Sequence, residues 1–200
     1  MTVYIPFGGH CGPAMILDKC GLRKEALPFD WVFALPEYIK DSLDTDFSKW
    51  FDLDNLEVLD HEDGHYQTNC LSYPITSNSK DEVLSFFNHH DMSDPIVQKT
   101  YRRRIERFKN IIDSDEHIVF LTTSSKPDMN KNGLIDYFKR DGLTDFIFLE
   151  WVNKPKNIIR ADFKDNYLTI KYFSRSHLAN HPTSFLIGDL LRSIDIALKK

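Results

Sequence analysis

Cysteine is scarce in this sequence. Its 200 residues contain three cysteines, at positions 11, 20 and 70, which is an odd number without a CxxC or other paired spacing. A disulfide framework uses an even set of cysteines at regular spacings. We therefore expect no disulfides, and a chain that works in the cytoplasm of whichever cell makes it.

Long apolar runs and an excess of basic charge are also missing. No run reaches the roughly eighteen apolar residues of a membrane-spanning helix, and the start, Met1-Thr2-Val3-Tyr4, lacks the basic and apolar regions of a signal peptide. The 25 Lys and Arg residues are outnumbered by 30 Asp and Glu residues, which gives a net charge of −5. A general nucleic-acid binder carries a basic surface instead. We therefore expect a soluble protein that has neither a membrane nor a nucleic acid as its partner.

What the sequence does have is the composition of a globular domain. Hydrophobic residues make up 42% of the chain and charged residues 28%, and no repeat or low-complexity tract interrupts them. A chain of this length buries a sizeable core without disulfide or metal staples. We predict a single domain over residues 1–200, of the mixed α+β or α/β class.

Apolar spacing predicts strands and helices in alternation. The clearest elements are buried strands at 117–122 and 146–151, and an amphipathic helix at 94–113 that Asp94 and Pro95 open. Also expected are helices at 35–43, 46–51, 127–142 and 184–199, a short strand at 57–59, a strand within 66–74, an extended segment at 83–91, and an antiparallel hairpin of 157–163 with 167–173. The acidic segment 52–64 is otherwise predicted to be a loop.

The most informative stretch is residues 3–17, which reads as a short strand, a glycine-rich turn and the start of a helix. Pro13 suits the first helical position, and Gly21 is a natural stop for this helix. Cys11 therefore lies at or just before a helix N-terminus. There the free N–H groups and the helix dipole favour an anion, so we expect a thiolate to form more easily than in a free cysteine. A nucleophilic thiol is one interpretation of this pattern.

Two other interpretations of the same stretch stand beside it. Cys11 is followed by an apolar helix, and most cytosolic cysteines are small buried hydrophobic residues. A strand, glycine-rich loop and helix can also bind a phosphate or nucleotide through the backbone of the loop. In that case the Gly8 to Gly12 loop belongs to a non-catalytic binding module, and Cys11 only packs.

A resemblance favours the nucleophile. The series Gly8-Gly9-His10-Cys11-Gly12-Pro13-Ala14, Gly21-Leu22-Arg23-Lys24 and Pro28-Phe29-Asp30-Trp31 is followed by Phe86-Phe87-Asn88-His89-His90-Asp91 and an Arg-rich helix from Tyr101 to Ile112. This set resembles the family of papain-like cysteine peptidases known as domain of unknown function 1796. The resemblance implies a thiol peptidase fold, hence a hydrolase that cleaves a peptide, isopeptide or other acyl bond in a peptide or protein substrate. A peptidase fold without activity, used in protein interaction, is a further alternative.

The residue that accepts the proton of Cys11 is expected in the pair His89-His90. Neighbouring side chains of an extended segment point to opposite sides, so only one of the two can meet Cys11. His90 is preferred, because the family pattern places the histidine directly before the acid; His89 is the reserve, followed by histidines 177, 181 and 117. Backbone N–H groups around Gly9 to Gly12 would form the oxyanion hole.

An acid would complete the site by orienting the imidazole. Asp91 is adjacent to His90 and points away from it, so Asp30 is preferred, although Asp91 remains in the candidate set. A carboxylate between Phe29 and Trp31 needs a dedicated partner when it is buried, and a local turn acceptor is as good an explanation as an orienting role. We expect Phe29 and Trp31 to be core residues, and Cys20 and Cys70 to be chemically quiet.

No cofactor and no metal are expected. His61 and His65 are four residues apart, but Gly64 and the loop composition disfavour a helical two-histidine site. A papain-like arrangement, in which a helix presents the thiol to a histidine from the sheet, is favoured for the fold. The strand, helix, strand order around Ile118 and Phe148 suits a three-layer Rossmann-like sandwich equally. The sequence leaves the oligomeric state open.

Overall fold

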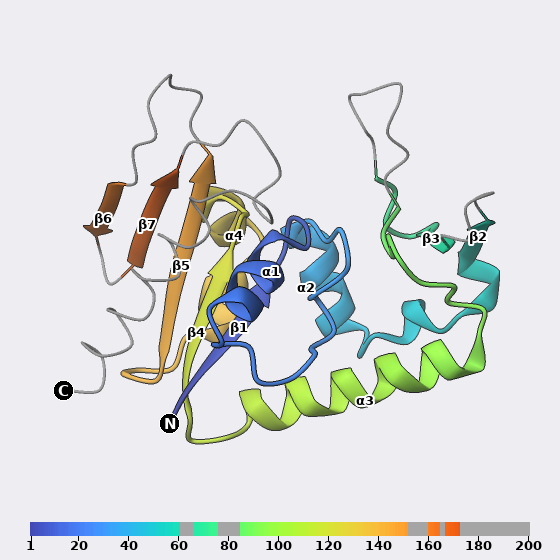
Figure 1. Ribbon diagram of the computed structural model, residues 1–200, viewed down its shortest axis with the longest axis horizontal. Coiled ribbons are helices and arrows are strands. Elements are labelled where there is room, and N and C mark those ends of the chain that lie inside the picture. The colour runs from blue at the N-terminus through green and yellow to red at the C-terminus, as the bar shows by residue number, and fades with distance from the viewer. Residues whose placement is uncertain (61–65, 76–84, 152–159, 165–166, 173–200) are drawn as a thin grey trace.

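The structure is a computed structural model that describes residues 1–60, 66–75, 85–151, 160–164 and 167–172. A five-stranded sheet forms its centre, with the strand order β1-β4-β5-β7-β6 (Figure 1). The strands are β1 (Thr2–Phe7), β4 (His117–Thr122), β5 (Thr144–Trp151), β6 (Arg160–Lys164) and β7 (Tyr167–Tyr172). All neighbours are parallel except β6, which pairs antiparallel with β7. The predicted mixed class and the predicted hairpin are both confirmed.

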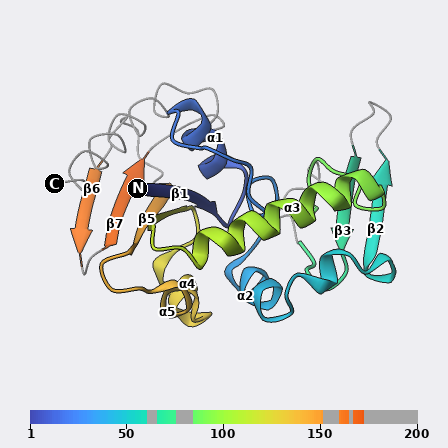
Figure 2. The ribbon, with the colours of Figure 1, turned by 90° about the horizontal axis from the view of Figure 1, so that it is seen from below.

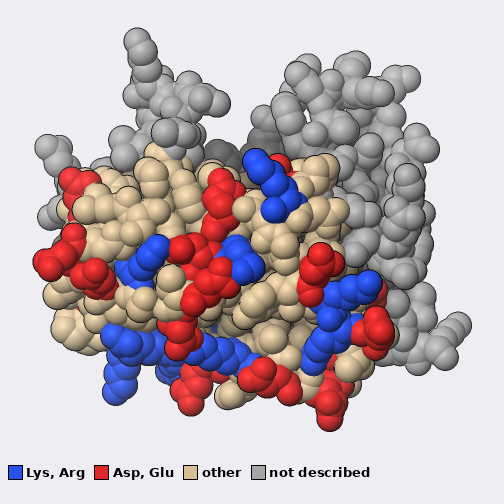
Figure 3. All heavy atoms as spheres, turned by 180° about the vertical axis from the view of Figure 1, so that it is seen from behind, with Lys and Arg blue, Asp and Glu red and all other residues tan. Residues whose placement is uncertain are grey.

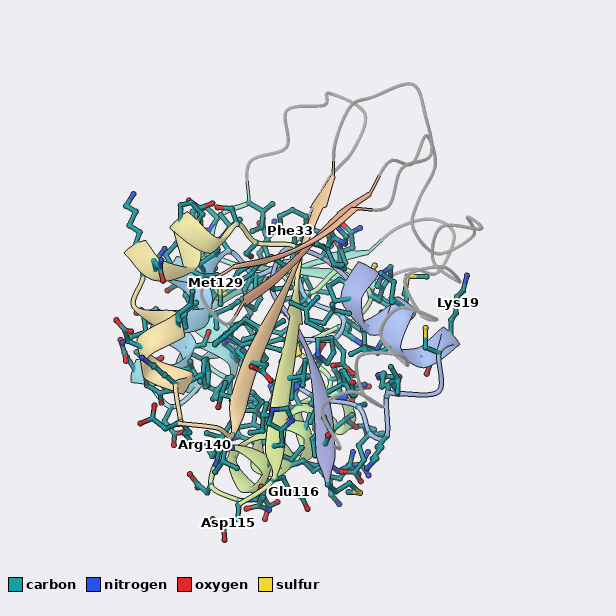
Figure 4. All side chains as sticks on the ribbon, turned by 90° about the vertical axis from the view of Figure 1, so that its left-hand side faces the viewer. Lys19, Phe33, Asp115, Glu116, Met129 and Arg140 are labelled. Atoms are coloured by element: carbon teal, nitrogen blue, oxygen red, sulfur yellow. The ribbon has the colours of Figure 1, made fainter. Side chains whose placement is uncertain are left out.

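Helices cover both faces of this sheet (Figure 2). Side chains alternate along β1, so Tyr4 faces one side, where it packs with Ile16 and Leu17 of α1 (Gly12–Lys19). Ile5 and Phe7 face the other side, in the core that α2 (Pro36–Asp44), α3 (Pro95–Ile112), α4 (Lys126–Lys131) and α5 (Leu134–Phe138) share. In Figure 4, Lys19 of α1 and Met129 of α4 accordingly lie on opposite sides of the strands.

The connection from β4 to β5 contains two short helices. The single helix predicted at 127–142 is wrong, because the chain breaks at Gly133, whose φ of 68° an ordinary residue rarely adopts. Together α4 and α5 connect β4 to β5, and these two strands are parallel. A helical crossover between parallel strands is the connection that the Rossmann-like alternative requires. The placement of α1 directly after Cys11 is what the papain-like arrangement requires.

A smaller antiparallel sheet of β2 (Leu56–Asp60) and β3 (Tyr66–Cys70) lies beyond α2. The short strand predicted at 57–59 is therefore β2, which is longer by one residue at each end, and two 3-10 turns at Ser48–Trp50 and Leu53–Asn55 precede it. Asp46 does not cap a helix as expected, because Asp46 and Phe47 both adopt positive φ values, 51° and 60°. The predicted extended segment 83–91 instead forms single bridges at Phe87 and then turns.

Aromatic side chains fill the space between the two sheets. Trp50 is 0% exposed, and its ring makes edge contacts with the rings of Phe29, Phe47, Phe86, Phe87 and Tyr101. The long helix α3 closes this core from below (Figure 1). It starts as predicted, since the Asp94 side chain accepts a hydrogen bond from the Ile96 N–H at 2.8 Å.

Several expectations fall on residues outside those that the structure describes. They concern the candidate metal pair His61 and His65, the reserve bases His177 and His181, residues 157–159, and the helix expected at 184–199. Within the described residues, none of the helices has the length and apolar character needed to cross a membrane.

Candidate functional site

The loop between β1 and α1 is built on two glycines at the carboxyl edge of the sheet. Gly8 and Gly9 have φ values of 69° and 80°. A Cβ atom on Gly9 would lie 2.1 Å from Oγ1 of Thr123, which follows β4. The Gly9 N–H donates to the carbonyl of Ala34 at 2.9 Å, which ties the loop to the segment before α2. The loop therefore needs glycine here, because other segments of the same chain approach its backbone closely.

Cys11 is the residue that precedes α1, as predicted. Its φ and ψ of −66° and −9° continue into the helix, and its side chain makes no capping hydrogen bond. The cap comes from His10 instead, whose Nδ1 accepts a hydrogen bond from the Gly12 N–H at 2.9 Å. This role of His10 was not predicted, although a histidine next to the glycine turn is a signal that the sequence contains.

Burial raises the pKa of the Cys11 thiol, and the residue's own backbone N–H opposes that effect only in part. This direction is opposite to the expected one. A half-buried thiol loses hydration of its charged form, and this loss is the largest influence on the pKa of Cys11. Among the described residues no hydrogen bond joins the Cys11 sulfur to a histidine ring.

The backbone N–H groups of the loop are mostly in use. Those of Gly9, His10 and Gly12 donate to the Ala34 carbonyl, the Gly8 carbonyl and the His10 ring. The oxyanion hole expected from the sequence, made by the N–H groups from Gly9 to Gly12, therefore has fewer free donors than predicted. The candidate that remains is the N–H of Cys11, which lies beside its own sulfur, since Ala14 is 0% exposed.

Hydroxyl groups surround this loop on the side of β4. Thr123 Oγ1 donates to the Gly8 carbonyl at 3.2 Å, and Ser124 and Ser125 follow. Ligands of parallel α/β sheets usually bind at the carboxyl ends of the strands, where Cys11 and these hydroxyls lie. The place and the polar groups suit either a nucleophile or the binding of an anion.

Asp30 is buried, with 1% of its surface exposed. Its Oδ2 accepts hydrogen bonds from Arg23 Nε at 2.9 Å, Arg23 Nη2 at 2.6 Å and the Leu27 N–H at 3.0 Å. Burial raises the pKa of the Asp30 carboxyl, while the Leu27 N–H and Arg23 oppose the rise. Three donors and a cation on one oxygen favour the carboxylate at neutral pH. Asp30 thus fixes its own loop through Arg23 and Leu27, and these hydrogen bonds leave the orienting role expected of it without support.

His89 and His90 point to different partners, as the sequence indicates. The His89 ring is exposed and lies 6.5 Å from the ring of Trp31. The His90 ring is half-buried, and its centre lies 5.3 Å from that of Tyr101 in α3. Burial, with the charges of Arg104 and His89, lowers the pKa of His90 to about 4.

The Asp91 side chain stabilises the turn in which it lies. Its Oδ1 accepts hydrogen bonds from the Ser93 N–H at 2.8 Å and from the Ser93 hydroxyl at 2.6 Å. The structure therefore brings Asp30 and His90 to the same part of α3, but it shows Asp91 engaged with the turn that leads into this helix.

Trp31 is not a core residue, unlike Phe29. Phe29 is 2% exposed, whereas Trp31 is only partly buried and has the Arg23 guanidinium 5.6 Å from its ring centre. The expectation for Trp31 was wrong because the chain turns between the two aromatics, and the turn puts the second ring at the surface. Together with His89, Trp31 forms an aromatic surface that the sequence did not reveal.

Two reserve assignments can be placed as well. His117 begins β4 opposite Thr2, at the end of the sheet away from Cys11, and its Nε2 lies 2.9 Å from Asp145 Oδ2. The length of β1 separates it from the thiol, so it is excluded as the base. Cys20 and Cys70 are 7% and 1% exposed, and burial raises the pKa of Cys70 to about 11, as expected for quiet thiols.

The Arg-rich helix is mainly a solvated surface. Arg102 and Arg103 are exposed, Lys109 pairs with Asp46, and Arg107 lies 3.6 Å from Glu25. On the face that Figure 3 shows, acidic side chains lie among the basic ones. Arg104 differs from its neighbours, because its guanidinium turns inward over the ring of Tyr101.

The comparisons with known proteins agree with the resemblance seen in the sequence. The family model described as "Putative papain-like cysteine peptidase (DUF1796)" matches residues 2–140. The uncharacterized protein R408 of Acanthamoeba polyphaga mimivirus is 31% identical over 147 residues, which cover 63% of this chain and 63% of that protein. The match thus spans less than two thirds of the relative's length. No solved structure matches the chain.

Proposed function

Because the chain belongs to the family described as papain-like cysteine peptidases, we propose that it is a thiol hydrolase whose nucleophile is Cys11. The observation that carries this proposal is the position of Cys11. It directly precedes α1 at the carboxyl edge of a parallel sheet, within the residues that the family model matches. The other cysteines are buried, so Cys11 is the thiol that a substrate can reach.

In the proposed reaction the Cys11 sulfur attacks the carbonyl carbon of an acyl bond. Its raised pKa means that the resting group is a thiol, so a base must take the proton as the sulfur attacks. His90 or His89 takes that proton and gives it to the leaving amine or alcohol. Water then hydrolyses the thioester with the same histidine as base. The N–H group of Cys11 is the proposed donor to the oxyanion.

The substrate class in this proposal is a peptide, isopeptide or other acyl compound, and the cellular site is the cytoplasm. All three cysteines are free, which suits a reducing compartment. The surface of Trp31 and His89 offers an aromatic platform for a substrate chain.

The test is labelling by a thiol-reactive peptide aldehyde and by iodoacetamide across a range of pH. We expect labelling of wild type and of the control variant Cys20→Ala, and none of Cys11→Ala. His90→Ala should slow the reaction of Cys11 while His89→Ala leaves it unchanged. The reverse pattern would assign the base to His89, and a folded protein without labelling at Cys11 would contradict the proposal.

A second candidate function is a binding module that holds an anionic ligand in the Gly8 to Gly12 loop. The raised pKa of Cys11 and the hydroxyls of Thr123 and Ser124 favour it. Thermal stabilisation by nucleotides and sugar phosphates separates the two. Equal stabilisation of wild type and Cys11→Ala supports the binding module, and no stabilisation of either removes it.

A further inference from the structure

Two residues of α3, Tyr101 and Arg104, face the interior together. Residues three apart on a helix share a face, whereas Arg102 and Arg103 between them point to solvent. Tyr101 is 0% exposed. The Arg104 guanidinium lies 5.0 Å from the centre of the Tyr101 ring. This face of α3 is also the one that His90 contacts.

The charge of Arg104 is not neutralised by direct contact. Within the described residues, its buried Nε and Nη1 atoms have no acceptor other than the neighbouring hydroxyl of Tyr101. The acid that its charge influences is Asp30, whose Oδ2 binds Arg23 while its buried Oδ1 has no hydrogen-bond partner among the described residues. A partly buried cation without a directly bonded counter-ion costs free energy, and its field is less screened than that of a surface charge. Such an arrangement in a helix that could have carried an apolar side chain points to a role beyond packing.

His90 is the group on which this charge acts. Its ring meets the Tyr101 ring edge-on, with centres 5.3 Å apart and planes at 86°. Its carbonyl accepts a hydrogen bond from the Thr68 hydroxyl at 2.8 Å, so both ends of the residue are fixed. The imidazole is thereby held against α3 in one orientation.

We infer that Tyr101 and Arg104 are positioning residues for His90: the tyrosine ring sets the plane of the imidazole, and the guanidinium places a permanent positive charge over the same ring. The inference rests on the proposed function, in which His90 is the preferred base. A cation next to an imidazole disfavours its protonated form, so His90 stays ready to accept a proton across the physiological pH range.

Two positive charges act on His90 in this direction, Arg104 on α3 and His89 on its own turn. The Tyr101 ring that packs against the imidazole is neutral, and the Asp30 carboxylate, which influences Tyr101 and Arg104, is paired with Arg23. Burial is the largest cause of the lowered pKa of His90, and Arg104 is the next. Removal of the Arg104 charge should therefore raise the pKa of His90 without restoring its ordinary value.

The experiment is an NMR titration of the His90 imidazole in the full chain carrying Cys11→Ser. We expect Arg104→Gln to raise the His90 pKa by about half a unit to one unit. The matched control Arg103→Gln, next to it on the exposed face, should leave the titration unchanged. Arg104→Lys retains the charge and should stay close to wild type. Equal titration curves for folded Arg104→Gln and wild type would overturn the inference.

A second measurement covers the case in which Arg104→Gln does not fold. Tyr101→Leu then removes the ring, and the ring-current shift of the His90 resonances should be lost; an unchanged shift would contradict the positioning role. The Cys11→Ser background separates this result from the proposed function, since the titration needs no activity. A shifted titration, together with an unchanged pH profile of Cys11 labelling when Arg104→Gln is made in the chain that keeps Cys11, would retain the positioning pair and reject His90 as the base.

Discussion

Gly9 shows, at the scale of single residues, how the candidate site depends on the absence of a side chain. Its φ is 80°, and an added Cβ would collide with Thr123. Gly21 has a similar φ of 66° but nothing within 4 Å of the same position. Substitution of Gly21 therefore tests backbone strain alone, whereas substitution of Gly9 tests strain together with a steric collision.

We expect Gly9→Ala to lower the free energy of unfolding by about 2 to 4 kcal/mol, from left-handed strain plus overpacking. Gly21→Ala should cost about 1 to 2 kcal/mol, from strain alone. Urea denaturation of both variants measures the difference. Equal losses would mean that the loop at Gly9 relaxes away from Thr123.

The lowered pKa of His90 predicts how the free energy of unfolding changes with pH. Its pKa is about 4 in the folded chain against an ordinary value of 6.5, so the unfolded chain binds the proton first as pH falls. The resulting stability is complete above about pH 6.5 and is lost as pH falls towards 4. For a half-buried ring we expect a loss of about 1 to 2 kcal/mol after solvent screening.

The measurement compares wild type with His90→Gln by urea denaturation at about pH 7.5 and about pH 4.5. The variant should lose less stability than wild type between the two conditions. His89→Gln, an exposed neighbour, should behave like wild type. A His90→Gln variant with the same pH dependence as wild type would show that the imidazole is solvated.

Sequence reasoning located single residues well where local chemistry decides, and poorly where distant segments meet. It placed Cys11 before a helix because Gly12 and Pro13 fix the local backbone. It missed Arg104, because nothing local separates this arginine from its exposed neighbours. The predicted direction of the Cys11 pKa shift was wrong for the same reason. A helix start can be recognised in the local sequence, whereas the burial that raises this pKa depends on packing between distant segments.

At the scale of elements, Arg140 joins the end of one helix to the start of a strand. Its guanidinium donates to the carbonyls of Ile112, Ser114 and Glu116, at the end of α3 and before β4. In Figure 4 Arg140 lies at the same end of the sheet as Glu116. The last carbonyls of a helix lack partners within the helix, and a cation there also interacts favourably with the negative end of the helix dipole.

We expect Arg140→Ala to destabilise the protein by about 2 to 3 kcal/mol, since it leaves three carbonyls without a charged donor. Lys139→Ala, at an exposed neighbouring position, should change stability by less than about 0.5 kcal/mol. Thermal unfolding followed by circular dichroism compares them. Similar melting temperatures for the two variants would mean that water replaces the guanidinium.

Elements with strong local signals were predicted within one or two residues, and those that depend on a partner were not. The cap at Asp94 and the apolar stripe fixed α3, and the apolar runs fixed β4 and β5. The strand β2 was predicted as residues 57–59 only, because its full extent depends on pairing with β3, which its acidic sequence does not show. That all 200 residues form one domain stays a prediction.

At the scale of the whole molecule, the aromatic core around Trp50 joins the large sheet to the small one. Its cluster contains Phe7 and Phe120 from the large sheet and Cys70 from β3. A shared core of this kind makes the two sheets unfold together. The described part of the chain should therefore behave as one cooperative unit.

We expect unfolding curves from far-UV circular dichroism and from tryptophan fluorescence to coincide in the wild type. Trp50→Ala should lower the stability by about 3 to 5 kcal/mol, the usual cost of removing a large buried aromatic side chain. Its two curves should also separate, because the link between the sheets is lost. Separate curves in the wild type would reject the shared core.

The pairing of β1 with β4 also sets when the candidate site can assemble on the ribosome. Thr2 pairs with His117 and Phe7 with Thr122, so the strand that leads to Cys11 has no neighbour in the large sheet until β4 has been synthesised. Chains grow at about 5 to 20 residues per second, so the first strand waits for several seconds. During that time Thr123 is not yet there to hold the glycine turn. A nascent chain therefore carries Cys11 long before the loop around this residue has its final geometry.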